Sequence, residues 1–552
     1  MTISIEDAHR QLTAPGQLFE MDELDIRGVR TRVWKNAPPS LRAIWERTER
    51  FADRTYVVFE DERMTYSDAH AAVATLAHRL RDDFGVAKGD RVAIAMRNFP
   101  EWPVAFWAAA VVGAIVVPLN AWWTGAELEY GLADSGTKVL VADAERWQRL
   151  DGHLDRLSDL ATIVVRGEDE DAAPLAWEDV LAGAPPTKLP DVDIDPEDDA
   201  TIFYTSGTTG RPKGALGTQR NITTNLISLL FAAARTALRS GDAPKPPAAA
   251  PEQNANLLSV PFFHATGCHS ILCANTYAGN KLVLMYRWNP ERALELIERE
   301  RVTSFGGVPT MVWQVLQSPD FDKRDISSVQ SIGYGGAPAP PELVRRIEEM
   351  FPGRTPSNGY GLTETSSLST SNGGADYIAR PDSVGVPVAV VDVKVVGGEL
   401  WIKGPNVVKG YWNKPDATAQ AFTDGWLQTG DVARIDDEGF VYIVDRAKDM
   451  IIRGGENVYC SEVESALFEH PAVMDAAVIG VPHDVLGEEV GAVVQLKLGA
   501  VASAADLQAH VAERLAGFKV PAHVWFRDDD LPRNPAGKVL KRELREALVQ
   551  PR

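Results

Sequence analysis

From residue 41 onward the chain alternates short apolar strands with helices, and this alternation constrains the fold more than any other feature. The pattern predicts a helix over 66–80 and then a strand in GDRVAIAM (89–96). A helix over 101–112, a strand over 114–118, a helix over 125–133 and a strand over 138–142 follow. Such alternation predicts a parallel sheet covered by helices.

The same rhythm begins again at LLSVPFFHATG (257–267) and continues through KLVLMY (281–286), a helix over 291–301 and SFGGVPTM (304–311). It indicates a second α/β sheet subdomain. Beyond residue 382 the strands become short, in VDVKVV (391–396), GELWIKG (398–404) and GFVYIVD (439–445). We expect a small β-barrel-like subdomain or antiparallel sheet there.

With 552 residues the chain is too long for one hydrophobic core. The pattern predicts an N-terminal domain over 1–446 and a small, mobile α+β C-terminal domain over 447–552. Residues 1–40 show little periodicity, and we expect them to lie across the surface.

Composition excludes several classes of protein. A net charge of −21 and a pI of about 5.0 argue against nucleic acid as a partner. Cys268, Cys273 and Cys460 form neither a disulfide framework nor a zinc cluster, which favours a reducing cytoplasm. The longest apolar run, 104–119, is shorter than a membrane span, so we expect no transmembrane segment. The N-terminus lacks the apolar region of a signal peptide. A homodimer is compatible with the sequence.

The stretch TSGTTGRPKG, Thr205 to Gly214, follows the short apolar run 202–204 and is a candidate functional loop. Its glycines allow the backbone to approach a ligand closely, and its N–H groups and hydroxyls are neutral donors for anionic oxygens. No GK[ST] triplet follows at the spacing of a Walker A loop. The stretch predicts a polyphosphate-binding turn, with an ordinary surface turn as the alternative.

Five further motifs follow in series: GYGGAP (333–338), NGYGLTET (358–365), TGD (429–431), DRAKDMIIRGGE (445–456) and PRNPAGK (532–538). Together with the glycine- and threonine-rich stretch, they resemble the core motifs of the acyl-adenylate-forming superfamily. This resemblance extends over residues 40–545 and points to the branch of carboxylic acid:CoA ligases.

The resemblance implies an enzyme that uses ATP and Mg²⁺ to join a carboxylic acid to CoA through an acyl-adenylate, releasing AMP and pyrophosphate. An enzyme that passes the acyl group to a carrier-protein thiol or to an amine is the alternative; the absence of an attached carrier domain favours CoA. A nucleotide sensor without catalysis fits less well, because a sensor would not need the lysine at 538.

Lys538 is the first catalytic candidate, because in the resemblance the matching lysine bridges the substrate carboxylate and the α-phosphate. Two anions 4 Å apart repel by about 1 kcal/mol in water and about 4 kcal/mol at an effective dielectric constant of 20. Positive charge therefore has to lie between them. Glu364 matches the Mg²⁺ ligand, and Thr363 would reach the α-phosphate. A solvated lysine and a helix-start carboxylate are the alternatives that the residues alone leave open.

The resemblance also assigns the rest of the ATP site. The β- and γ-phosphates would lie against Thr205, Ser206, Gly207, Thr208, Thr209, Gly210 and Lys213. Adenine would stack on Tyr360 and lie beside Gly335, Gly336, Ala337, Asn358, Gly359 and Gly361, with Asn358 reading its amino group. Asp431 would accept the ribose hydroxyls, supported by Arg446; the alternative for Asp431 is an exposed turn.

His264 follows PFF and in the resemblance helps to orient the substrate carboxylate, although a lone histidine among apolar residues is more often part of the core. The expected pocket wall consists of Phe263, Ala265, Gly307, Val308, Tyr334 and Gly361. Many of these residues are small or apolar, which favours an uncharged tail on the acid, either aryl or fatty.

Lys448 matches the hinge on which the C-terminal domain turns between the two half-reactions. Gly454 and Gly455 would then approach the passage for the CoA thiol, and Phe518 could stack on the adenine of CoA. Some relatives hold the CoA 3′-phosphate with a basic residue where this chain has Val520. That contact must come from elsewhere or be missing.

Overall fold

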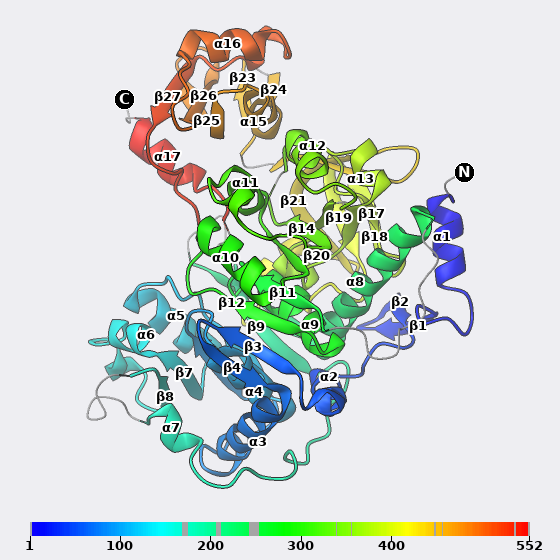
Figure 1. Cartoon of the computed structure of the whole chain (residues 1–552), viewed down its shortest axis with the longest axis vertical. Helices are drawn as coiled ribbons and strands as arrows, with labels where there is room; N and C mark the ends of the chain where they lie inside the picture. The colour runs from blue at the N-terminus through cyan, green and yellow to red at the C-terminus, as the bar shows by residue number, and fades with distance from the viewer. Residues whose placement is uncertain are drawn as a thin grey trace.

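The structure is a computed structural model that describes residues 3–167, 175–205, 211–241, 253–337, 339–354, 356–446, 449–454, 456–534 and 537–549. In Figure 1 the segment that follows residue 449, drawn in orange and red, stands at one end of a larger body. None of the helices in the described ranges combines the length and apolar character that a bilayer crossing requires.

A six-stranded sheet in the order β10-β9-β6-β5-β7-β8 contains the first α/β stretch. Its strands pair in parallel except for β9 and β10, so the predicted parallel sheet is confirmed. The strands are β5 (Arg91–Ala95), β6 (Ile115–Pro118), β7 (Val139–Asp143), β8 (Ala161–Val165), β9 (Asp199–Thr205) and β10 (Lys213–Thr218). The accompanying helices are α3 (Tyr66–Asp82), α4 (Glu101–Val111), α5 (Gly125–Ser135), α6 (Ala144–Arg149) and α7 (Trp177–Val180).

A nine-stranded sheet in the order β17-β16-β15-β14-β13-β11-β12-β3-β4 contains the second stretch. Its strands are β3 (Thr55–Phe59), β4 (Glu62–Thr65), β11 (Ala255–Leu258), β12 (Lys281–Leu284), β13 (Ser304–Gly307), β14 (Ser331–Gly335), β15 (Pro356–Tyr360), β16 (Thr370–Gly373) and β17 (Val386–Pro387). The helices over this part are α8 (Gln219–Arg239), α9 (Cys273–Ala278), α10 (Pro290–Glu300), α11 (Pro309–Gln317), α12 (Pro341–Met350) and α13 (Ala375–Ala379). Because β3 pairs with β12, the two sheets are not built from two successive stretches of chain.

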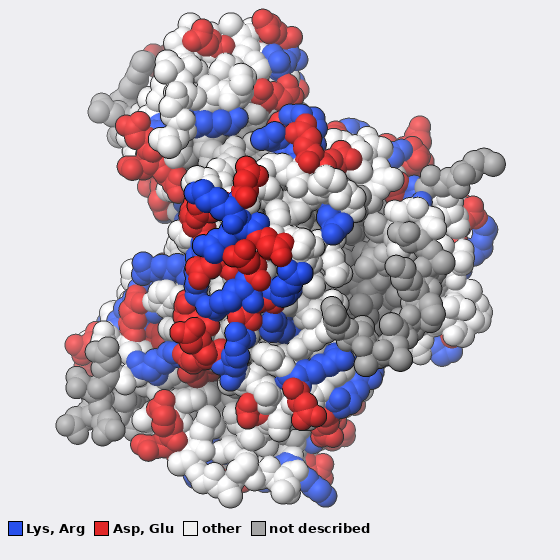
Figure 2. Space-filling model, in the orientation of Figure 1, with Lys and Arg blue, Asp and Glu red and all other residues white. Residues whose placement is uncertain are grey.

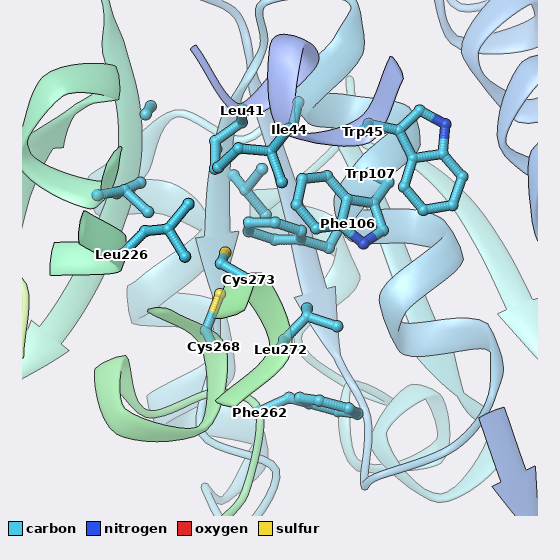
Figure 3. Close-up of a cluster of buried hydrophobic side chains, with 14 of the residues drawn as sticks. Leu41, Ile44, Trp45, Phe106, Trp107, Leu226, Phe262, Cys268, Leu272 and Cys273 are labelled. Atoms are coloured by element: carbon cyan, nitrogen blue, oxygen red, sulfur yellow. The ribbon is translucent and has the colours of Figure 1, made fainter. Parts of the chain in front are cut away.

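The two large sheets share one hydrophobic core. Helix α4 lies in it, with Trp102, Phe106 and Trp107 fully buried. Trp107 stacks on Trp45 of α2 (Leu41–Glu46), with ring centroids 5.3 Å apart, and Figure 3 shows Phe106 and both tryptophans in this cluster. Such burial explains why the apolar run 104–119 needs no membrane.

Two smaller sheets follow. The first holds β18 (Asp392–Val396), β19 (Glu399–Lys403), β20 (Phe422–Thr423), β21 (Trp426–Ile435) and β22 (Val441–Arg446), all antiparallel as predicted, with α14 (Pro415–Ala421) beside it. The second holds β23 (Ile451–Arg453), β24 (Glu456–Val458), β25 (Val473–His483), β26 (Gly487–Leu496) and β27 (His523–Arg527) with α15 (Cys460–Phe468), α16 (Ala504–Ala512) and α17 (Lys541–Leu548). This second group has its own buried cluster, which agrees with the predicted α+β tail.

The N-terminal residues are more ordered than the sequence pattern predicts. They form α1 (Ile5–Leu12) and a hairpin of β1 (Met21–Ile26) and β2 (Val29–Trp34). Ser4 caps α1 by accepting from the backbone N–H of Asp7. The His9 ring packs edge-on against Phe231 of α8, with centroids 5.1 Å apart. A helix of two turns gives too few periods for a sequence pattern to reveal it.

Basic and acidic side chains are intermixed on the face that Figure 2 shows. Around α10, Arg292 pairs with Glu60, and Arg324 pairs with Glu298. The described residues of this face therefore form no extended basic surface of the kind that nucleic acids require.

Candidate active site

A hairpin presents the glycine- and threonine-rich stretch. Strands β9 and β10 are antiparallel, and Thr205 lies opposite Lys213 at the end of the hairpin where the connecting residues begin. Ser206, Gly207, Thr208, Thr209 and Gly210 lie outside the described residues. The ammonium group of Lys213 lies 5.2 Å from the ring centroid of Tyr411.

The carboxyl ends of three parallel strands meet beside this hairpin, at the sheet edge where α/β proteins bind ligands. Gly307 of β13 lies opposite Tyr334 of β14, which in turn lies opposite Asn358 of β15. At Gly335 a Cβ would come within 2.3 Å of the Gly359 carbonyl oxygen, so only glycine permits this approach. Gly336, Ala337 and Gly361 follow the ends of β14 and β15.

Asp431 is buried and both of its oxygens are engaged. Strands β21 and β22 place it opposite Arg446, whose Nε lies 2.6 Å from Oδ1. The Tyr360 hydroxyl donates to Oδ2 at 2.6 Å. Burial, reinforced by the charge of Asp431, raises the pKa of Tyr360 well above its usual value, so the phenol stays a donor. The carboxylate is thereby fixed beside the expected adenine wall.

Glu364 lies in the short helix η5 (Thr363–Thr365). Its Oε1 accepts from the Tyr411 hydroxyl at 2.8 Å, while no hydrogen bond to Oε2 occurs among the described residues. Burial and the Glu364 charge raise the pKa of Tyr411, which keeps this donor protonated. Sequence reasoning missed Tyr411, which is 47 residues from its partner.

The acid-site residues come from the segment that follows β11 and from the ends of β13 and β14. Phe263, Ala265, Val308 and Tyr334, which are expected to form the pocket wall, are buried. The Nε2 atom of His264 is buried and has no hydrogen-bond partner among the described residues. Burial lowers the pKa of His264 to about 4, so the imidazole is neutral at pH 7.

The loop that carries Lys538 contacts this wall. Gly537 has φ +81°, and a Cβ there would lie 2.4 Å from Cγ2 of Val308. The Lys538 N–H donates to the Asn534 side-chain oxygen at 2.9 Å, and the Asn534 N–H donates to the Lys538 carbonyl at 2.8 Å. The structure therefore brings this loop of the C-terminal part to Val308, in the expected acid site.

Two residues that sequence reasoning missed hold this loop. Arg533 donates to the Gly537 carbonyl at 2.6 Å and forms an ion pair of 2.5 Å with Asp475 of β25. Burial raises the pKa of Asp475, and the Arg533 charge opposes that shift. The arginine thus ties the lysine loop to the C-terminal sheet.

The residues predicted to bind CoA lie in the C-terminal part. Gly454 has φ +60°, and its N–H donates to the Leu486 carbonyl at 2.7 Å. Phe518 is half-buried and packs against the cluster of this sheet. Gly455 and Lys448 lie outside the described residues.

Four residues that the sequence did not single out form a surface group, termed here the cationic patch: Arg97, Trp122, Tyr286 and Arg287. The Arg97 guanidinium carbon lies 4.9 Å from the ring centroid of Trp122 and 5.5 Å from that of Tyr286. Arg287 also lies over Tyr286, at 5.5 Å. No ion pair joins either arginine to a carboxylate of the described residues, although the Tyr286 hydroxyl donates to Oε2 of Glu145 at 3.1 Å. Trp122 is 47% exposed.

The cationic patch adjoins the segment that leads to His264, in the expected acid site. Arg97, Trp122 and Tyr286 follow the carboxyl ends of β5, β6 and β12. Asn98, next to Arg97, accepts from the Phe262 N–H at 3.0 Å. Nδ2 of Asn98 also donates to the Val260 carbonyl at 3.5 Å, so two hydrogen bonds of Asn98 connect the patch to the segment that carries His264.

Comparison with known proteins gives matches over most of the chain. Residues 44–412 match the family model of the AMP-binding enzyme, and residues 462–538 match that of the AMP-binding enzyme C-terminal domain. A feruloyl-CoA synthase from an Amycolatopsis species is 36% identical over 87% of this chain and 93% of its own. A long-chain-fatty-acid–CoA ligase from Bacillus subtilis is 34% identical over 90% and 92%.

Solved structures of CoA ligases are also similar to this chain. The anthranilate CoA ligase AuaEII in complex with anthranoyl-AMP has a TM-score of 0.83 and 27% identity, over 92% of this chain and 97% of its own. The o-succinylbenzoate CoA synthetase of Bacillus subtilis in complex with its acyl-adenylate intermediate has a TM-score of 0.76 and 30% identity, over 93% and 99%.

Proposed function

The chain belongs to the family of AMP-binding enzymes and is an AMP-forming acid–thiol ligase, and we propose that its residues activate a carboxylic acid with an aryl or fatty tail and transfer it to CoA. The acid oxygen attacks the α-phosphate of ATP, pyrophosphate leaves, and the CoA thiol then displaces AMP from the acyl-adenylate. The buried wall of Phe263, Val308 and Tyr334 supports an uncharged tail.

One observation carries this proposal: the loop of Lys538 lies against Val308, at the wall of the acid site. A lysine in this loop can supply charge where a carboxylate and the α-phosphate have to approach each other. Neutral His264, with its unpartnered Nε2, supports a hydrogen-bonding role toward the acid and adds no second charge.

Glu364 is the proposed ligand for Mg²⁺. The described residues contain no group of three or more histidine, cysteine, aspartate or glutamate side chains arranged around a metal. Magnesium fits a site with one carboxylate because it takes its remaining ligands from substrate phosphates and water. When bound, the ion would neutralise phosphate charge. The Tyr411 hydrogen bond would orient the carboxylate toward it.

We place the domain boundary after residue 446, with Lys448 as the hinge. The separate core of the C-terminal sheet supports this division. The contact between Gly537 and Val308 corresponds to the adenylation arrangement. Rotation about the hinge would withdraw Lys538 and bring Gly454 and Gly455 to the thiol passage.

The cationic patch is the proposed site for the 3′-phospho-ADP end of CoA. Because the chain carries a net charge of −21, an anionic cosubstrate needs a local cationic site. Arg97 and Arg287 have no carboxylate partners among the described residues, and Trp122 offers an exposed ring for adenine. This site would supply the phosphate contact that Val520 cannot make.

Kinetics with truncated CoA test this site. We expect Arg97→Gln with Arg287→Gln to raise the KM for CoA by about tenfold or more and to leave the KM for pantetheine unchanged. The control is Arg47→Gln, since the Arg47 guanidinium lies 4.3 Å from the centroid of Tyr277 and likewise lacks an ion pair with a described carboxylate. An equal change in the KM for CoA and the KM for pantetheine would exclude the cationic patch as the site of the 3′-phospho-ADP end.

A panel of aryl and fatty acids of graded length, assayed for pyrophosphate release with and without CoA, tests the proposed reaction. We expect acid-dependent release and an acyl-CoA product by mass spectrometry. The structure of the amide bond synthetase McbA is also similar to this chain, with a TM-score of 0.79 and 28% identity. An amine is therefore the alternative acceptor to test beside CoA. If an amide forms and CoA is not consumed, the acceptor is an amine and not CoA. Mg²⁺ dependence and a cytoplasmic location are parts of the same proposal.

A further inference from the structure

The π-helix η3 (Thr266–Leu272) lies between the acid site and the turn that carries Thr363 and Glu364. It begins two residues after His264. Its side chains Cys268 and Leu272 are fully buried in the shared core, where Figure 3 shows them. The helix is therefore anchored on one side. π-Helical turns are rare and occur frequently at functional sites.

Two polar side chains of η3 contact the turn that follows Glu364. Nδ1 of His269 lies 3.3 Å from the Ser366 carbonyl oxygen, to which a protonated Nδ1 donates. The Ser270 hydroxyl donates to Oγ of Ser367 at 2.8 Å. The turn is thus tied to a helix that is far from it in sequence.

The His269 ring has a second contact at the ATP site. It packs edge-on against Phe203, with ring centroids 4.9 Å apart. Phe203 belongs to β9, which leads into the glycine- and threonine-rich stretch. One buried histidine therefore touches the strand before the expected phosphate loop and the turn after the expected Mg²⁺ ligand.

The turn needs such contacts because its backbone is unfavourable. Ser366 has φ +53° and Ser367 has φ +102°, backbone angles that residues other than glycine rarely adopt. Such conformations persist only where the surroundings hold them. The amide of Asn406 contributes by donating to the Thr365 carbonyl at 3.2 Å.

We propose that His269 is a positioning residue that holds this turn through the Ser366 carbonyl, so that Thr363 and Glu364 stay placed for the α-phosphate and Mg²⁺. The inference rests on the proposed function. His269 acts through the backbone and does not touch the reacting atoms. Since η3 also follows His264, it connects the acid site to the metal-binding turn.

The test uses three variants in the pyrophosphate-release assay. His269→Phe keeps an aromatic ring against Phe203 and removes the donor, and His269→Asn keeps a donor. The control is His70→Phe, because His70 is another mostly buried histidine, 2.8 Å from the Thr48 hydroxyl. We expect His269→Phe to raise the Mg²⁺ concentration for half-maximal rate by about tenfold and the KM for the acid by less than about twofold. His269→Asn should recover most of this loss, and His70→Phe should leave both values unchanged.

A second substitution separates backbone strain from packing. Ser366→Gly removes the unfavourable φ at a residue whose hydroxyl has no partner among the described residues. We expect His269→Phe with Ser366→Gly to regain part of the Mg²⁺ affinity. If His269→Phe does not fold, His269→Leu takes its place.

A wild-type Mg²⁺ requirement in a folded His269→Phe enzyme, or an equal rise in the KM for the acid, would overturn the positioning role. Absence of recovery in the double variant would also overturn it. If the wild-type enzyme itself releases no pyrophosphate with any acid, the proposed function fails instead, so the two failures are distinguishable.

Discussion

Gly537 lies so close to Val308 that a Cβ at residue 537 would come within 2.4 Å of the valine Cγ2. These residues are 229 positions apart by their numbering and belong to the C-terminal part and the acid-site wall. The contact links the loop of Lys538 to the place where the acid is expected to bind.

Gly537→Ala tests this contact. The substitution forces an alanine into φ +81°, which costs about 1–2 kcal/mol, and places its methyl group against Val308. We expect adenylation to slow by about tenfold or more, while thioester formation from preformed acyl-adenylate changes little. The control is Gly499→Ala, since Gly499 has φ +77° with no atom near its added Cβ. Equal effects of the two variants on adenylation would mean that the contact is not functional.

Tyr411→Phe tests how Glu364 is oriented. The variant loses the hydrogen bond of 2.8 Å to Oε1, which is worth about 1 kcal/mol, so the Mg²⁺ concentration for half-maximal rate should rise by about fivefold. A metal titration of the adenylation rate measures it. Tyr442→Phe is the matched control, because the Tyr442 hydroxyl donates to Asp436 at 3.0 Å outside the proposed site. An unchanged metal requirement in Tyr411→Phe would argue against Glu364 as the ligand.

Low pH should destabilise the fold, because the fold contains buried histidines. Burial lowers the pKa of His70 and of His269 to about 4, below the unfolded value of about 6.5. The unfolded chain therefore binds more protons between these values, and stability falls as pH decreases from about 6.5 to about 4. Each fully shifted histidine corresponds to about 3 kcal/mol at most. Melting temperatures across this range should fall less steeply for His70→Phe than for the wild type. The same slope in both proteins would contradict the assignment for His70.

Local structure could be predicted from the sequence where periodicity and capping residues agree. The helix expected over 66–80 is α3, and Thr65 and Asp68 form its capping box. The helix expected over 101–112 is α4, which ends one residue earlier, at Val111. The placement of β3 beside β12 could not be predicted, because nothing in either strand specifies a partner more than 200 residues away.

The candidate site, like the fold, could be predicted from the sequence only in part. Motifs identified Asp431 and Arg446, and the structure brings the two side chains together across neighbouring strands. Tyr411 and Arg533 were missed, although Arg533 stands inside a motif. Their importance depends on partners that only the fold brings near, namely Glu364 and the Gly537 carbonyl. Single side chains without a motif, such as Arg97, give no sequence signal at all.

The most direct test of the central claim compares both half-reactions in the wild type and in Lys538→Ala. Acid-dependent pyrophosphate release reports adenylation, and conversion of preformed acyl-adenylate to acyl-CoA reports thioester formation. We expect adenylation to fall by about a hundredfold or more and thioester formation to fall far less. Equal losses in the two half-reactions would contradict a lysine that serves adenylation from a loop docked on Val308.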